Sequence, residues 1–353
     1  MADASATRDI KLSCRNVWKV YGTDPGDFFP AGNGKVDDAR AHIARIRQDG
    51  HIVACADVSF EVNEGEIFII MGLSGSGKST IVRCLSRLVE PTAGEVLFNG
   101  QDLLKSSRDE LTEIRRHKMG MVFQNFGLMP HLTAIDNVAF PLKVQGIAPA
   151  ERLKRAAEML ELVGLSGREK NFPSELSGGQ QQRVGIARSL AVKPELWYLD
   201  EPFSALDPLI RRQMQDEFLR LQKMLHKTIV FITHDFLEAL RLGDRIAIMK
   251  DGVVVQIGTP SEVVMRPADA YVAEFTQDVP RVKVITVGEC MEAGPAPGGA
   301  GRIGMGLTLE QVLPQFSRGV GALDCVDEGG TVRGHVTPSG VLMALATEEG
   351  RAP

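Results

Sequence analysis

Residues 72–80 read GLSGSGKST, and this stretch decides the fold. An apolar strand pattern (67–71) precedes it, and a helical pattern follows it. Glycines let backbone N–H groups curl around phosphate oxygens, and the start of a helix adds partial positive charge there. The spacing is that of a phosphate-binding loop, which requires a glycine, then a glycine, a lysine and a hydroxyl residue: Gly72, Gly77, Lys78 and Ser79.

The side chains of this loop are expected to divide between phosphate and metal. Lys78 is predicted to reach the β- and γ-phosphates, and the Ser79 hydroxyl to ligate Mg²⁺. The other loop residues expected to contact the nucleotide are Ser74, Gly75, Ser76 and Thr80. A chance glycine-rich turn is the alternative, but the flanking strand and helix patterns argue against it.

A second apolar run, LWYLDE at 196–201, ends in two carboxylates. A nucleotide hydrolase with a phosphate loop needs a carboxylate for Mg²⁺ at the end of a buried strand. We expect Asp200 to hold Mg²⁺ through water and Glu201 to act as the general base on the attacking water. Taken alone, Glu201 could equally be a solvated carboxylate at a strand end.

The arrangement of the patterns predicts an α/β core. Short apolar runs alternate with helical periodicity, which is typical of buried parallel strands. The turn Asp251-Gly252 predicts a hairpin. The ranges expected are strands at 10–20, 52–62, 66–71, 94–99, 195–199 and 228–233, a helical region at about 126–192, a helix near 209–225, and a last helix at 260–276 that closes the domain.

Two further segments stand apart from this core. Residues 22–51 are rich in turn residues and contain a short helix pattern at 36–48. Residues 277–353 predict a β-α-β-β-α unit, barely large enough for a core of its own. Its expected elements are a strand (282–287), a Gly/Pro-rich break (294–306), a helix (308–316), strands at 321–326 and 331–337 around a turn at 328–330, and a helix (339–347).

The composition excludes several classes of protein. The net charge of −5 argues against a nucleic-acid partner, which is normally bound by a basic surface. No run of 18 apolar residues is present, and the first residues, MADASATRDIKL, lack the pattern of a secretory signal. Five scattered cysteines without a CxxC pair predict reduced, buried thiols. We therefore expect a cytosolic chain that binds no nucleic acid.

The stretch LSGGQ at 176–180, which ends 20 residues before Asp200, resembles the signature motif of ATP-binding cassette (ABC) ATPases. It is another glycine-rich turn at a helix start, and so a second phosphate site. The resemblance implies a P-loop ATPase with a RecA-like core, an antiparallel β subdomain and a helical subdomain. It also implies ATP and Mg²⁺, and a head-to-tail homodimer in which the signature of one chain contacts the nucleotide of the other. The signature residues implied are Ser177, Gly178, Gly179 and Gln180.

Four other positions match the family. Gln124 resembles the Q-loop glutamine, which touches Mg²⁺ or water and couples to a membrane subunit. Asp207, in SALD at 204–207, resembles the D-loop aspartate, and His234 resembles the switch histidine that holds the γ-phosphate and Glu201. Tyr21 resembles the aromatic residue that stacks on adenine. Because an insertion follows it, Phe28 or Phe29 remains an alternative platform for adenine.

The insertion at 22–51 and the motifs around it resemble the ATPases of glycine betaine/proline importers, a group that also includes choline transporters. This resemblance implies a cassette over residues 1–276 and a single or truncated CBS-like regulatory module over 277–353. It implies transmembrane permease subunits as partners and, indirectly, a substrate-binding protein. The chain would then act as a peripheral protein on the cytoplasmic face of the inner membrane.

Two alternatives to this function remain. One is an ABC importer for another small solute, such as an amino acid or a polyamine. The other is an ABC ATPase outside transport, but such proteins usually carry two cassettes or long coiled-coil heptads, and neither pattern is present. The 277–353 segment could also be a degenerate tail that binds no ligand.

Overall fold

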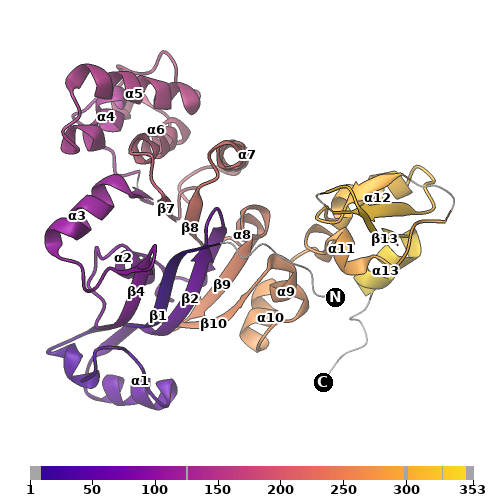
Figure 1. Cartoon of the computed structure of the whole chain (residues 1–353), viewed down its shortest axis with the longest axis horizontal. Helices are drawn as coiled ribbons and strands as arrows, with labels where there is room; N and C mark the ends of the chain where they lie inside the picture. The colour runs from indigo at the N-terminus through magenta and orange to yellow at the C-terminus, as the bar shows by residue number, and fades with distance from the viewer. Residues whose placement is uncertain (1–8, 125, 298–300, 328, 347–353) are drawn as a thin grey trace. The chain divides into compact units, whose positions relative to one another are not determined.

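The computed structural model describes residues 9–124, 126–297, 301–327 and 329–346. The chain forms two compact units, Met1–Ile257 and Gly258–Pro353 (Figure 1). The sequence placed the division later, after residue 276. Within the described residues, no helix combines the length and the apolar character that crossing a membrane requires.

A six-stranded sheet forms the centre of the first unit, in the order β10-β9-β3-β8-β7-β6. Its neighbouring strands β9, β3, β8, β7 and β6 pair in parallel. Strands β3, β7 and β8 are buried at every position, as expected for parallel strands covered on both faces. The bounds are β3 (Ile67–Met71), β6 (Met119–Val122), β7 (Leu196–Asp200), β8 (Thr228–Thr233), β9 (Arg245–Lys250) and β10 (Val253–Gly258).

A second sheet is antiparallel, in the order β2-β1-β4-β5. Its apolar side chains share one core with those of the central sheet, where Phe60 stacks on Phe68 with 4.7 Å between ring centroids. This sheet is the antiparallel subdomain that the sequence predicted. Its strands are β1 (Ile10–Tyr21), β2 (Ile52–Asn63), β4 (Ala93–Phe98) and β5 (Gln101–Asp102).

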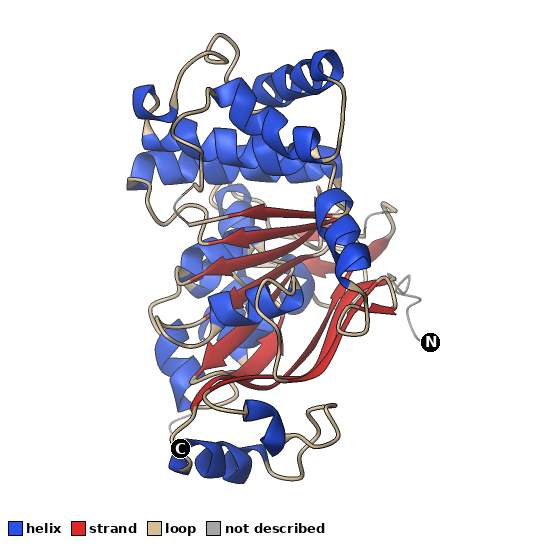
Figure 2. Ribbon diagram, turned by 90° about the vertical axis from the view of Figure 1, so that its left-hand side faces the viewer, coloured by secondary structure: helices blue, strands red, loops and turns tan. Residues whose placement is uncertain are grey.

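Three helices form a group at the top of Figures 1 and 2: α4 (Ala134–Val144), α5 (Pro149–Leu162) and α6 (Gly178–Ala191). They pack on one another and confirm the predicted helical region. The other helices of the unit connect strands: α2 (Lys78–Leu85), α3 (Arg108–His117), α7 (Pro208–Leu225) and α8 (Phe236–Leu242).

The insertion is the long connection between β1 and β2, and it folds back on this hairpin. It contains a short 3₁₀ helix, η1 (Pro25–Phe28), and α1 (Ala39–Gln48), which begins after the N-cap Asp38. Asp38 accepts a hydrogen bond from the Ala41 N–H at 3.0 Å. Phe29 and Ile46 pack against Trp18 in a small core of their own.

The second unit has a three-stranded sheet, β11-β12-β13, in which the first pair is parallel and the second antiparallel. Its elements are α9 (Pro260–Met265), α10 (Ala270–Thr276), η3 (Arg281–Lys283), α11 (Val287–Cys290), β11 (Arg302–Gly304), α12 (Leu309–Phe316), β12 (Leu323–Val326), β13 (Val332–Val336) and α13 (Pro338–Ala346). From β11 onward the order is β-α-β-β-α. Glu328 of the predicted turn and Thr347 of the predicted last helix lie outside the described residues.

Two predictions for this unit were wrong. The strand expected at 282–287 is absent, because Thr286 starts α11 by a capping box: its N–H donates to the Glu289 carboxylate at 2.7 Å. The first strand of the unit instead lies in the predicted break. The helix expected at 260–276 is two helices, because Pro267 follows the first and Asp269 caps the second, accepting from the Val272 N–H.

Candidate nucleotide site

Four loops meet at one edge of the central sheet. The phosphate loop follows β3, and His234 follows β8. Asp200 ends β7, Glu201 comes directly after it, and Gln124 follows β6. These strands are consecutive neighbours and parallel, so their carboxyl ends lie side by side. The topology therefore brings together residues that are more than 150 positions apart in the sequence.

The phosphate loop has no room for side chains at two of its glycines. A Cβ on Gly72 would lie 2.2 Å from the Met249 carbonyl oxygen, and a Cβ on Gly77 would lie 2.4 Å from the Ala54 carbonyl oxygen. Both residues also have positive φ angles, 150° and 97°. The backbone is thus held against its neighbours in a curl that only glycine permits at these positions.

Lys78 lies inside this curl. Its ammonium donates hydrogen bonds to the carbonyl oxygens of Gly72 at 2.8 Å and Leu73 at 2.9 Å. Burial lowers the pKa of Lys78, an effect that the nearby carboxylates of Glu201 and Asp200 oppose. The Ser76 hydroxyl is also buried and has no hydrogen-bond partner among the described residues. A polyanion in the loop would match both groups.

Ser79 and Asp200 form the candidate metal pair. The Ser79 hydroxyl donates to the Asp200 carboxylate at 3.0 Å. Burial raises the pKa of Asp200, while the Ser79 hydrogen bond acts in the opposite direction. Within the described residues, no three or more His, Cys, Asp and Glu side chains are grouped so that they could hold a metal ion by themselves. A hydroxyl and one carboxylate suit Mg²⁺, which keeps most of its ligands from water and phosphate.

Glu201 lies at the centre of the predicted catalytic residues. Its Oε2 accepts from Gln124 Nε2 at 3.2 Å and lies 3.1 Å from His234 Nδ1. Its backbone is left-handed, with φ 45°, and its N–H donates to the Ile232 carbonyl at 3.1 Å. Left-handed backbone is uncommon for a non-glycine residue and is often found at functional sites. The structure thus groups all three predicted side chains around one carboxylate oxygen.

A pocket of about 670 Å³ opens above these residues. The side chains of Gln124, Glu201 and His234 line it, together with the phosphate loop and the start of β2 at Ile52, Val53 and Ala54. The volume lies within the usual range for a small-molecule site. The start of β2 was not predicted as part of the site, although its pairing with the end of β1 could have indicated it.

Tyr21 is the strand partner of Ile52, which lines this pocket. The residue is 44% exposed, and the Lys19 ammonium lies 4.7 Å from the centroid of its ring. Phe29 is only 6% exposed in the core of the insertion, and Phe28 packs against the His51 ring at 5.0 Å. Of these three aromatic side chains, Tyr21 is therefore the one available for stacking on adenine.

The signature residues are not among those that line this pocket. Ser177 caps α6 in a capping box: its N–H donates to Gln180 Oε1 at 3.0 Å, and the Gln180 N–H donates to Ser177 Oγ at 3.4 Å. Asp207 caps α7, accepting from the N–H groups of Leu209 and Ile210. Gly178 and Gly179 form the first turn of α6. Five residues predicted to bind nucleotide are thus at two helix starts away from the phosphate loop.

A second cavity, of about 530 Å³, is an apolar groove between α3, β6, α4 and α6. Phe123, Met129, Phe140 and Val144 line it, and Arg115, Arg116 and Arg188 lie along it. Arg188 donates to the carbonyls of Phe126 at 3.0 Å and Gly127 at 2.6 Å, and so holds the segment after Gln124.

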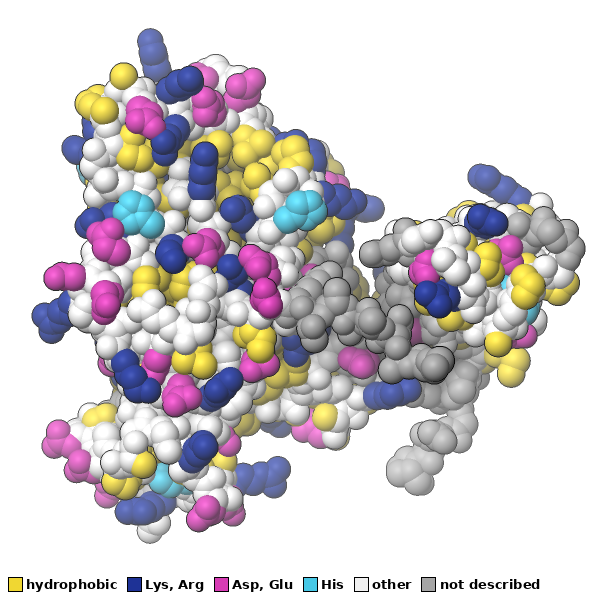
Figure 3. All heavy atoms as spheres, viewed as in Figure 1, with side chains coloured by type: hydrophobic (Ala, Val, Ile, Leu, Met, Phe, Trp, Pro, Cys, Tyr) yellow, Lys and Arg dark blue, Asp and Glu magenta, His cyan; other side chains and the backbone are white. Residues whose placement is uncertain are grey.

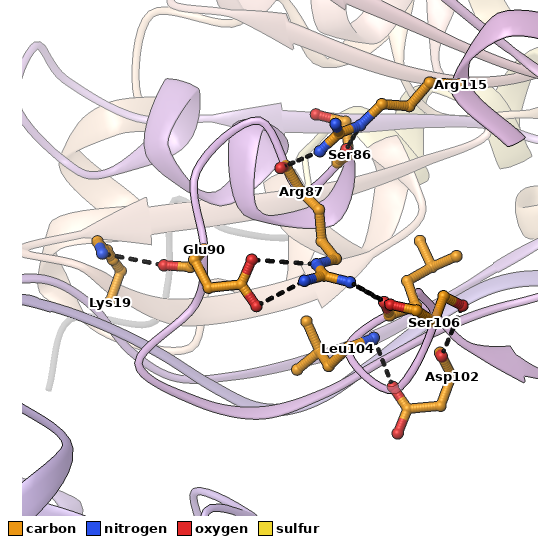
Figure 4. A network of polar contacts seen from close by, with 9 residues as sticks. Lys19, Ser86, Arg87, Glu90, Asp102, Leu104, Ser106 and Arg115 are labelled. Carbon is orange, nitrogen blue, oxygen red and sulfur yellow. Dashed lines mark hydrogen bonds and ion pairs between the residues drawn. The ribbon is translucent and has the colours of Figure 1, made fainter. Parts of the chain in front are cut away.

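Arg115 connects this groove to the helix of the phosphate loop (Figure 4). Its Nε donates to the Ser86 carbonyl at 2.9 Å, and its Nη2 donates to the Arg87 carbonyl, both just after α2. Arg87 in turn forms two hydrogen bonds to the Glu90 carboxylate, at 3.0 and 3.1 Å. Because α2 begins at Lys78, this helix links the wall of the groove to the phosphate loop.

Comparisons with known proteins agree with this geometry. The family profile described as ABC transporter matches residues 55–204. The trimethylamine N-oxide transport system ATP-binding protein TmoW of Pelagibacter ubique is 50% identical over 97% of this chain and 99% of its own. TmoW of Ruegeria pomeroyi is 54% identical over 95% and 96%. The glycine betaine/proline betaine transport protein ProV of Escherichia coli is 50% identical over 76% and 66%.

Among solved structures, the dimeric ATP-binding cassette MJ0796 bound to ADP and Pi is 37% identical, with a TM-score of 0.58 over 70% of this chain and 98% of that chain. The fold and the grouped loops define a P-loop ATPase of the ABC class. The chain belongs to the ABC transporter family, among the ATP-binding subunits of quaternary amine and osmolyte transport systems. These findings confirm the family, the P-loop cassette fold and the ATPase activity predicted from the sequence.

Proposed function

We propose that this chain hydrolyses ATP to drive uptake of a small methylated amine through a separate membrane permease. The observation that carries the proposal is the arrangement of Gln124, Glu201 and His234 above a phosphate loop in a chain of this family. Trimethylamine N-oxide is the first candidate for the cargo. The TmoW relatives align along almost the whole chain, including its second unit, whereas ProV aligns over 76% of it.

Glycine betaine, proline betaine and choline form the second set of candidate cargoes. Relatives named for their transport are 43–50% identical to this chain over shorter stretches. All these solutes carry a fully substituted nitrogen, so one class of transport system accounts for them. On the face of the first unit drawn in Figure 3, basic side chains are interspersed with acidic ones.

The chemistry assigns a task to each grouped residue. Lys78 would leave the carbonyls of Gly72 and Leu73 for the β- and γ-phosphates, exchanging neutral acceptors for charged ones. Glu201 would accept a proton from the attacking water through Oε2. Gln124 and His234 would orient that carboxylate, and His234 would also contact the γ-phosphate. Tyr21 would stack on the adenine ring.

Ser79 and Asp200 would hold Mg²⁺, with Gln124 as a further ligand. When bound, the ion would neutralise charge that develops on the phosphate oxygens. The pair is already in hydrogen-bond contact, and burial of Asp200 favours a cation beside it. No large rearrangement of these two side chains is therefore required.

Two copies of the chain would complete the nucleotide site. Ser177, Gly178, Gly179, Gln180 and Asp207 lie at helix starts, where N–H groups and the helix dipole favour an anion, but they do not line the pocket of their own chain. They would contact the nucleotide of the partner chain. The related cassette MJ0796 is dimeric in its solved structures.

The groove between α3 and α6 is the proposed dock for the permease. Its apolar lining and three arginines fit a helix with one apolar face and an acidic side chain. A chain docked there would be peripheral, on the cytoplasmic face of the inner membrane, and a substrate-binding protein would act on the other side.

We propose that the segment 277–353, within the second unit, is a single or truncated CBS-like regulatory module. Its β-α-β-β-α order from β11 to α13 and its separate apolar core support this assignment.

Uptake of radiolabelled solutes tests the cargo directly. Cells that lack this gene would be complemented with the wild-type chain or with Glu201→Gln. We expect the wild-type chain to restore uptake of trimethylamine N-oxide and Glu201→Gln to restore none. If only betaine or choline uptake is restored, the cargo belongs to the second set of candidates. If uptake of none of these solutes is restored, the cargo is not a methylated amine.

A further inference from the structure

A small cavity adjoins the nucleotide pocket and shares Glu201 and His234 with it. Its volume is about 10 Å³, close to what one water molecule needs. It lies between the loop after β7, helix α7, the loop after β8 and helix α8. Among the residues that line it are Glu201, Ser204, Arg211, His234, Asp235 and Glu238.

Arg211 of α7 joins the two loops that carry the catalytic residues. Its Nη2 donates to the Leu206 carbonyl at 3.2 Å, in the loop that follows Glu201. Its Nη1 donates to Asp235 Oδ2 at 3.5 Å, one residue after His234. The Arg211 Nε is buried and has no hydrogen-bond partner among the described residues, so the cavity beside it suits a bound water.

A second polar contact between α7 and α8 supports the first. Glu238 is buried, and its carboxylate accepts from Gln215 Nε2 at 2.9 Å, one turn after Arg211 on α7. The Glu238 N–H donates to Asp235 Oδ1 at 3.1 Å, so Asp235 caps α8 with one oxygen and meets Arg211 with the other. The position of the His234 loop is thus fixed from α7 by two contacts.

We propose that Arg211 is a positioning residue for hydrolysis, which holds the loops of Glu201 and His234 in one register through Leu206, Asp235 and a buried water. The inference rests on the catalytic roles proposed above for Glu201 and His234. Their shared contact, 3.1 Å between Oε2 and Nδ1, requires both loops to be in place at once. Leu206 is next to Asp207 in the chain. If a second chain contacts Asp207 and shifts this loop, Arg211 would therefore shift the His234 loop with it.

The main test compares Arg211→Met with Arg212→Met, a substitution of the exposed neighbour on the same helix. Steady-state ATPase rates would give kcat and KM, and a fluorescent ATP analogue would give nucleotide affinity. For Arg211→Met we expect kcat to fall about ten- to hundredfold, as for a misplaced catalytic group, with affinity changed less than about twofold. Arg212→Met should leave kcat, KM and affinity as in the wild type.

Two further variants separate positioning from loss of folding. Arg211→Lys keeps the charge near Asp235 and should recover part of kcat. Asp235→Asn should lower kcat, and its effect should not add to that of Arg211→Met, because both break one contact. These two variants also decide the question if Arg211→Met fails to fold.

Three outcomes would overturn the inference. Arg211→Met could keep the wild-type kcat, or the double variant could show additive effects. Alternatively, Arg211→Met could lose nucleotide affinity and melting temperature to the same extent as kcat. Glu201→Gln, measured in parallel, distinguishes this failure from that of the proposed roles. An active Glu201→Gln would refute the general base, whereas an inactive Glu201→Gln with an active Arg211→Met would refute only the role of Arg211.

Discussion

At the scale of single residues, the hydrolysis step depends on the Glu201 carboxylate as the proposed general base. Replacing it with glutamine keeps the shape and the contact with His234 but removes the base. We expect Glu201→Gln to lower kcat by about 10²- to 10⁴-fold, the usual contribution of a general base, with ATP affinity retained. Phosphate release and nucleotide binding, measured on the same preparation, check this. A variant with near wild-type turnover would show that another group accepts the proton.

Substitutions of Tyr21 and Phe29 should have opposite effects on ATP binding and on stability. Loss of a base-stacking ring costs about 1–3 kcal/mol, so Tyr21→Ala should weaken ATP binding by roughly five- to hundredfold without unfolding the chain. Phe29→Leu, in the core of the insertion, should lower the melting temperature and leave affinity nearly unchanged. Titration calorimetry and thermal melts separate the two effects. The reverse pattern would place the adenine platform in the insertion.

Much of the site could be predicted at this scale because each motif depends on a chemical requirement. The phosphate loop, Asp200 and Glu201 are specified by spacing and by the strands before them, and the structure brings them to one sheet edge. Arg211 could not be predicted, because a single arginine inside a helix carries no such signal. Its partners, Leu206 and Asp235, are set by how two loops pack. The roles of the individual side chains stay predictions.

The insertion is the element whose behaviour should depend on pH. His51 Nε2 lies 2.8 Å from the Thr23 carbonyl and Nδ1 lies 3.1 Å from the Asp49 carbonyl, and both nitrogens can donate only when the ring is protonated. The hydrogen bond to Thr23, and then the contacts with Asp49, raise the pKa of His51 above 6.5. A raised pKa in the folded state adds stability below pH 6.5, and this stability is lost as the pH rises through the folded value.

We therefore expect the wild-type melting temperature to fall more between pH 6 and pH 8 than that of His51→Gln. Thermal melts of both proteins at matched ionic strength measure this difference. Parallel curves for the two proteins would show that His51 does not titrate with folding in this range.

The groove should matter for coupling and not for the chemistry. Val144 ends α4, is 48% exposed and lines the groove, so Val144→Arg should fold normally and keep the ATPase rate of the isolated chain. In cells with the permease, it should abolish uptake. Leu153→Arg, at an exposed position of α5 outside the groove lining, is the matched control and should transport normally. Equal uptake by the two variants would show that the permease binds outside this groove.

The sequence predicted most elements well, and its errors have local causes. Long periodic segments such as α5 and α7 appear where they were expected, because burial of one face determines them. The strand expected at 282–287 is instead a turn and a helix, because the Thr286–Glu289 capping box competes with strand pairing. Strand β11 has only three residues, too few for a pattern in a Gly/Pro-rich stretch.

At the scale of the whole molecule, we expect two chains to bind each nucleotide between them. The residues of the phosphate loop face a pocket that the signature of the same chain does not line. The start of α6 favours an anion, whereas the start of α7 is already capped by the Asp207 carboxylate. ATP should therefore act as a bridge between copies, and slow hydrolysis should allow the dimer to accumulate.

The most direct test is the mass of Glu201→Gln in solution, measured by light scattering with saturating ATP and Mg²⁺ or with ADP. Gly178→Asp in the same background is the control: a Cβ there meets nothing closer than 3.7 Å, and a carboxylate suits a helix start, yet it would repel the partner's phosphate. We expect ATP to give twice the chain mass of 38.4 kDa, and ADP or the double variant to give the single mass. A single mass for Glu201→Gln with ATP bound would contradict the account.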